Sequence, residues 1–151
     1  MPLTPQAQNN QGYGTSVLRQ GGGAAFVHQG AKLTAVSVVF TSNAARGGGG
    51  AIYCDSGGSM AVEHSAFIHN TAIHFGGGAV AVEGNGVGNG CVATISDSHF
   101  VQNHAHQNGG AINVGGKGSL TLHNVTFAGN ACGEPPTSPT RHKSALCAAI
   151  V

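Results

Sequence analysis

The chain of 151 residues has the length of a single domain, and 26 of its residues are glycine, more than twice the average usage of about 7%. Charged residues make up 7% of the chain and the formal net charge is +1, which excludes a nucleic-acid binder that works by neutralising phosphates and a charge-driven disordered segment. The sequence has no run of 18 apolar residues, so it contains no transmembrane helix.

Residues 1–20 form a polar N-terminal lead with two prolines and a Gln/Asn run. They lack the basic start and the apolar run of about 7–15 residues that mark a secretory signal peptide, so no signal peptide is visible. We therefore expect either an intracellular protein or a segment of a longer gene product.

Two short signatures alternate through the rest of the chain. One is a glycine pair followed by small and aliphatic residues, found at Gly22-Gly23, Gly49-Gly50, Gly77-Gly78 and Gly109-Gly110. The other is F-x-x-N, found at Phe40–Asn43, Phe67–Asn70, Phe100–Asn103 and Phe127–Asn130. Copies recur at about 27 residues, except where an insertion around 84–90 lengthens the third repeat. A fixed period of this length indicates a repeat architecture.

Each repeat contains three short runs in which apolar and polar residues alternate: one after the glycine pair, one before the phenylalanine and one ending on it. Such alternation predicts short strands with one buried face. Three strands joined by Gly, Asn and Ser turns describe one coil of a parallel β-helix, whose coils stack about 4.8 Å apart. We predict an all-β solenoid of about four coils over residues 21–132. The Pro-containing tail, 133–151, should leave the solenoid, and its apolar end could cover the last coil.

Stacked coils should align equivalent residues in ladders. The residues expected to face the interior are Ile52, Val62, Val80, Val82, Ile95, Ile112, Val114, Leu122 and the four phenylalanines, Phe40, Phe67, Phe100 and Phe127. A narrow corner should be lined by Ala45, Ala72, Ala105 and Cys132, and a turn by Asn43, Asn70, Asn103 and Asn130. The asparagines could form a binding row, but a ladder that satisfies turn amides is the interpretation we favour.

The alternating GGA[I/L/V] and F-x-x-N signatures resemble the repeat of the chlamydial polymorphic outer-membrane protein family, which also occurs in other secreted or surface β-helix proteins. The resemblance extends from Gly22 to Asn130. It implies right-handed coiling, as parallel crossovers also favour, and a secreted, cell-surface or outer-membrane location. It further implies an adhesin-like passenger segment, although the barrel of such proteins is not in this sequence.

One set of outward positions could carry a binding site. His28, Asp55 and Glu83 occupy the same place in successive repeats, and Phe26 and Tyr53 lie two positions earlier. Carboxylates one coil apart, about 5 Å, are within the range that retaining glycosidases use, so Asp55 and Glu83 are also candidate catalytic residues. An ordinary solvated face is the alternative explanation. A lyase is disfavoured further, because no Lys or Arg is in register with the acids.

Other reactive side chains offer weaker candidates. His74, His104 and His106 fall between a phenylalanine and the next glycine pair, where three imidazoles could hold a metal ion. Cys54 and Cys132 occupy positions filled by valine and alanine in other repeats, so both are predicted to be small buried hydrophobes. The cysteine spacing includes no C-x-x-C, which leaves the redox compartment open. The sequence indicates no cofactor.

Three classes of function follow. The first is a binding module for a glycan or a host or cell-surface protein, the second a pectin-lyase-like polysaccharide-active enzyme, and the third a purely structural repeat. Because solenoids need capped ends, we also expect that the gene product is longer or that the chain associates end to end.

Overall fold

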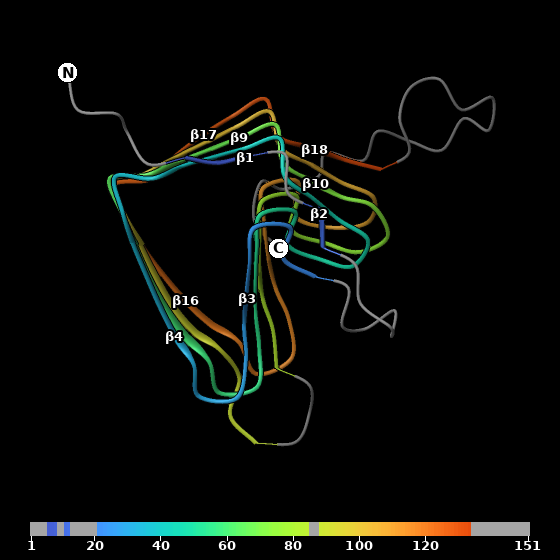
Figure 1. The fold of residues 1–151 in the computed structure, drawn as a ribbon. Helices are drawn as coiled ribbons and strands as arrows, with labels where there is room; N and C mark the ends of the chain where they lie inside the picture. The colour runs from blue at the N-terminus through green and yellow to red at the C-terminus, as the bar shows by residue number, and fades with distance from the viewer. Residues whose placement is uncertain (1–5, 9–10, 13–20, 85–87, 134–151) are drawn as a thin grey trace.

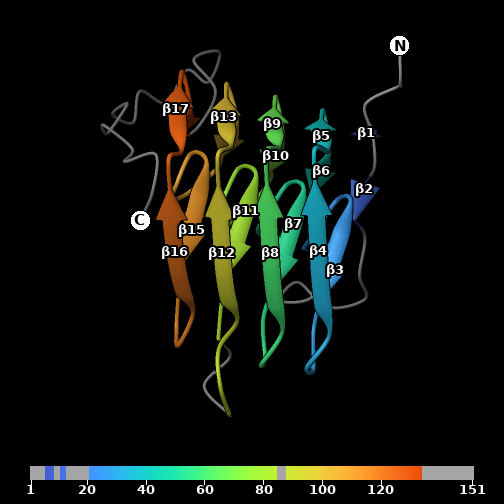
Figure 2. The same ribbon diagram turned by 90° about the vertical axis from the view of Figure 1, so that its left-hand side faces the viewer.

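The computed structural model describes residues 6–8, 11–12, 21–84 and 88–133, and its described elements are all strands (Figure 1). The strands form four parallel sheets in which equivalent strands of successive coils lie side by side. Figure 2 shows this most plainly for β4, β8, β12 and β16. The predicted parallel β-helix is confirmed.

The four coils repeat one order of strands. The first contains β3 (Ala25–Val27), β4 (Lys32–Val36), β5 (Val39–Thr41) and β6 (Ala44–Ala45). The second contains β7 (Ile52–Cys54), β8 (Ser59–Glu63), β9 (Ala66–Ile68) and β10 (Thr71–Ala72). The third contains β11 (Val80–Val82), β12 (Val92–Ser96), β13 (His99–Val101) and β14 (His104–Ala105). The fourth contains β15 (Ile112–Val114), β16 (Ser119–His123), β17 (Thr126–Ala128) and β18 (Ala131–Cys132).

The coil has four strands where the sequence predicted three. The fourth is only two residues long, too short for alternation to be visible in the sequence. Four sheets result: sheet A (β5, β9, β13, β17), sheet B (β6, β10, β14, β18), sheet C (β3, β7, β11, β15) and sheet D (β4, β8, β12, β16). Within the predicted polar lead, β1 (Gln6–Gln8) and β2 (Gln11–Gly12) pair in parallel with β5 and β6 and so extend sheets A and B.

The interior is built from the predicted ladders. The rings of Phe40, Phe67, Phe100 and Phe127 stack with centroid separations of 4.7, 4.5 and 5.2 Å. All predicted inward residues are buried except the members of the fourth coil that follow Ile112, namely Val114, Leu122 and Phe127, which are partly buried and pack against the core. A full coil on each side is therefore what completes the burial of an inward side chain.

The asparagines form the predicted turn ladder. The side-chain amide of Asn70 donates to the Phe40 carbonyl and to Oδ1 of Asn103, while its own Oδ1 accepts from the backbone and side-chain nitrogens of Asn43. Asn43, Asn70 and Asn103 are all buried. Because each side chain satisfies buried backbone groups as well as its neighbours, the ladder is structural and is not open to a ligand.

The glycine pairs meet two separate geometric demands. The first glycine of each pair has φ between 57° and 73°, a region that residues with a Cβ enter only at a cost. The second packs against backbone, since a Cβ at Gly78 would lie 2.7 Å from the backbone nitrogen of His104 in β14. The pairs therefore mark the turn from sheet B into sheet C.

The prediction that Cys54 and Cys132 are small buried hydrophobes is confirmed for the burial of Cys54, but both cysteines form disulfides, which the sequence analysis did not predict. Cys54, at the end of β7, forms a disulfide with Cys91, directly before β12, with a Cα–Cα distance of 5.6 Å. Cys132 is disulfide-bonded as well. Cys54 is buried as expected, but its partner lies beside the insertion of the third repeat, where the repeat alignment gave no equivalent position. The part of the predicted tail beyond residue 133 lies outside the described residues.

Candidate functional site

The outward face of sheet C carries the predicted aromatic row. Phe26, Tyr53, Ala81 and Asn113 are paired in register across β3, β7, β11 and β15. Phe26 is 43% exposed, and its ring stacks on Tyr53 at 5.6 Å between centroids and on His28 at 5.4 Å. The row therefore presents an aromatic surface over the first two coils.

The position of Asp55 differs from the expectation of a solvated acid. Asp55 is only 4% exposed, and its Oδ1 is hydrogen-bonded to Nδ1 of His28. The carboxylate is buried against His28 of the preceding coil, so Asp55 holds the His28 ring and does not offer a free carboxylate to a ligand.

Glu83 is the more accessible acid of the row. Its Oε1 accepts a hydrogen bond of 2.6 Å from the side-chain amide of Asn113, and its Oε2 lies over Gly115, where a Cβ would collide with it. Burial raises the pKa of the Glu83 carboxyl, the hydrogen bond from Asn113 lowers it in part, and the charge of Asp55 raises it. Burial, Glu83 and Asp55 together raise the pKa of Tyr53 to about 12.

A cleft of about 190 Å³ opens beside Tyr53 and Glu83. Its other lining residues are Gly47, Gly48, Phe75, Gly76, Gln107, Asn108 and Asn113. Two of its glycines leave no room for a side chain, because a Cβ at Gly48 would lie 2.8 Å from the Gly76 carbonyl oxygen and a Cβ at Gly76 would lie 2.8 Å from the Asn113 side chain. The sequence could not place Phe75, Gln107 or Asn108 here, since they lie in irregular segments between the F-x-x-N turn and the glycine pair.

The candidate histidines His74, His104 and His106 do not gather into a metal site. Among the described residues, no three His, Cys, Asp or Glu side chains gather closely enough to hold a metal ion. His104 lies on β14, where it pairs with Thr71, and His106 follows that strand. His74 is exposed in the preceding coil.

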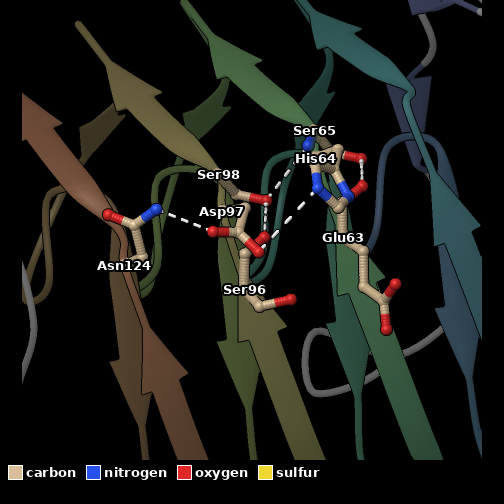
Figure 3. Close-up of polar contacts among 7 residues, drawn as sticks. All are labelled: Glu63, His64, Ser65, Ser96, Asp97, Ser98 and Asn124. Carbon is tan, nitrogen blue, oxygen red and sulfur yellow. Dashed lines mark hydrogen bonds and ion pairs between the residues drawn. The ribbon is translucent and has the colours of Figure 1, made fainter.

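A second polar row, which the sequence did not single out, runs along the corner between sheets D and A (Figure 3). His64, Asp97 and Asn124 occupy equivalent positions with φ near 50°. Asn124 donates to Asp97 at 2.7 Å, and His64 lies 3.9 Å from the same carboxylate. Asn, Asp and His are enriched in this left-handed conformation, so the row is explained by the shape of the corner.

At the same corner, serine hydroxyls form hydrogen bonds with backbone groups of neighbouring residues and of the preceding coil. Ser65 Oγ accepts from the backbone nitrogen of Val38 and donates to the Glu63 carbonyl. Ser98 does the same one coil on, toward Ser65 and Ser96. Figure 3 draws the bonds among Glu63, Ser65, Ser96 and Ser98. All of these serine bonds satisfy polar groups of the turn and leave sheet C as the better candidate for binding.

These observations define a parallel β-helix repeat protein with an aromatic outer face and an adjoining cleft. Residues 37–55 match the family model described as the Chlamydia polymorphic membrane protein repeat. The matched segment contains one F-x-x-N signature and the next glycine pair, so the resemblance is confirmed for this segment. Comparisons with curated proteins and with solved structures gave no match. Across the described residues, no helix has the length and hydropathy needed to cross a membrane.

Proposed function

We propose that this chain is a surface-displayed binding module, an adhesin-like passenger segment, and that it binds an extended partner along the outward face of sheet C. The observation that carries the proposal is the junction of the Phe26–Tyr53 aromatic stack with the cleft beside Glu83. Parallel strands space their side chains about 4.8 Å apart, and such a flat row suits a glycan or a peptide strand.

Two further observations support display outside the cytosol. The matched repeat belongs to a family of membrane proteins. The Cys54–Cys91 disulfide is buried in the core, and disulfides persist mainly in oxidising compartments. A secreted or outer-surface location agrees with both.

The polysaccharide-active enzyme has less support than binding. A two-carboxylate mechanism needs both acids to reach the substrate, whereas Asp55 is buried against His28 and is not among the residues that line the cleft. Turnover of a polysaccharide by the wild-type chain, abolished by Asp55→Asn with Glu83→Gln, would restore the enzyme hypothesis.

A combined glycan and peptide array tests the binding function. Tyr53→Ala should remove the binding seen with the wild type, because it deletes the ring that joins the aromatic stack to the cleft. Val92→Ala is the control, since Val92 is an exposed side chain that lies on sheet D, away from the cleft residues. Absence of any wild-type signal would favour a purely structural repeat, and equal binding by Tyr53→Ala would refute this site.

A further inference from the structure

We propose that the cleft beside Tyr53 binds a cationic head group, the ammonium of lysine or the guanidinium of arginine, presented by a partner polypeptide. This inference rests on the proposed binding function and names the chemistry of its ligand. It treats Glu83 as the anionic end of the cleft and Tyr53 and Phe75 as its aromatic walls.

The first argument is an uncompensated charge. Among the described residues, the Glu83 carboxylate accepts one hydrogen bond, from the neutral amide of Asn113, and the ion pairs within 4.0 Å are His28–Asp55 and His64–Asp97. The described residues that line the cleft include no Lys, Arg or His. A partly buried carboxylate gains most from a cation that arrives with the ligand.

The second argument is the surroundings of Glu83. Asp55 adds a negative charge on one side, although His28 is bonded to it, and Tyr53 contributes a neutral ring. The nearby Lys117 ammonium donates to the Gly88 carbonyl at 3.3 Å. Among the described residues that line the cleft, the charged side chain is the Glu83 carboxylate, which attracts a cation and repels an acidic glycan.

The third argument concerns the shape and the lining of the cleft. Aromatic faces attract cations by cation–π interaction, and Tyr53 and Phe75 both line the space. Asn108 and Asn113 can supply amide oxygens to N–H donors. The volume of about 190 Å³ is below the roughly 300–1,000 Å³ of small-molecule pockets, which suits one side chain whose backbone continues along the Phe26 row.

The test measures binding of fluorescein-labelled peptides to the full chain by fluorescence polarisation. Four peptides share one neutral sequence and differ in the central residue: arginine, citrulline, lysine or acetyl-lysine. We expect the cationic peptides to bind at least about tenfold more tightly than their neutral counterparts, the size expected of a charge-assisted contact. N-acetyl-arginine amide, as competitor, separates capture of a free cation from recognition within a polypeptide: it should compete only at much higher concentration than the arginine peptide.

Two variants assign the effect to Glu83. Glu83→Gln keeps the shape and removes the charge, and Gly115→Ala keeps the charge but displaces the carboxylate through the new Cβ. Both should reduce the preference for arginine over citrulline to less than about threefold, whereas Glu63→Gln, an exposed acid on β8, should not. Thermal unfolding of each variant shows whether it is folded, and a folded Glu83→Gln that retains the preference would refute the inference.

The two proposals fail separately. If the citrulline and arginine peptides bind equally and Tyr53→Ala abolishes both, the binding surface stands and its cationic ligand is wrong. Tight binding of a neutral glycan, with no preference for arginine over citrulline in the peptides, would likewise support the binding surface and refute the cationic ligand. If no peptide and no glycan binds the wild type, both proposals are wrong.

Discussion

At the scale of single residues, each asparagine of the ladder bonds to several buried groups, so the loss of one side chain breaks more than one hydrogen bond. Asn70 makes hydrogen bonds to three residues on the two neighbouring coils, Phe40, Asn43 and Asn103. Because these groups are buried, removing one side chain leaves several polar atoms without partners, at about 1–3 kcal/mol each. A central asparagine should therefore matter more than a terminal one.

We predict that Asn70→Ala lowers the free energy of unfolding by about 3–5 kcal/mol. Asn130→Ala should cost clearly less, since Asn130 is only partly buried in the fourth coil. Urea denaturation of both variants checks the order, and equal losses would contradict the argument from burial.

The charge of Glu83 gives a second prediction at this scale. Its pKa in the folded chain is raised above 4.5 by burial, so the folded state binds the proton more tightly than the unfolded state. That contribution to stability is present below the unfolded pKa and is lost as pH rises through the folded pKa. Glu83→Gln should thus be more stable than the wild type at pH 7, with the difference shrinking toward pH 4.

Chemical denaturation across this pH range measures the difference. Glu63→Gln, at an exposed position, serves as the control and should change stability little at either pH. A wild type that is more stable than Glu83→Gln at pH 7 would show that the carboxylate is compensated within the chain. The expected outcome would instead mark Glu83 as a residue kept for binding at a cost in stability.

At the scale of elements, the disulfide connects two segments that the repeat alone leaves independent. It joins the end of β7 to the residue before β12, across the coil that carries the insertion and Glu83. The 37-residue separation is long enough that the bond removes substantial entropy from the unfolded chain.

We predict that Cys54→Ala with Cys91→Ala lowers the free energy of unfolding by about 2–4 kcal/mol under non-reducing conditions. Denaturation is to be compared with the wild type without reductant, so that the disulfide of Cys132 stays formed in both proteins. A loss below about 1 kcal/mol would indicate that stacking of the coils already restricts this segment.

The same elements show what the sequence could predict. The repeat period fixed which residues share a ladder, because parallel pairing in register follows once the coils stack; Phe26 opposite Tyr53 is an example. It could not show that Asp55 is buried against His28, since burial at a coil corner depends on the turn and not on alternation. Phe75 and Asn108 lie in irregular segments without an alternating pattern, so only the three-dimensional structure shows that they line the cleft.

At the scale of the whole molecule, the solenoid ends differ from its middle. In the described part of the chain, β15, β16, β17 and β18 pair with a neighbour on one side only. Leu122 is partly exposed at its inward position, whereas Ile95, one coil earlier, is fully buried. Open strand edges above an incompletely covered core are a template for a further coil.

We therefore predict that the chain associates end to end as its concentration rises. Leu122→Lys should weaken this association, because a coil of a second molecule stacked on this end would bury the lysine. In the monomer, the flexible stem of the lysine can carry its ammonium to water. Thr121→Lys is the matched control, since Thr121 is exposed on the outer face of the same strand. Sedimentation equilibrium over a hundredfold range of concentration measures the effect. A wild type that stays monomeric throughout, or equal weakening by both lysines, would show that the end of the solenoid is covered within the chain.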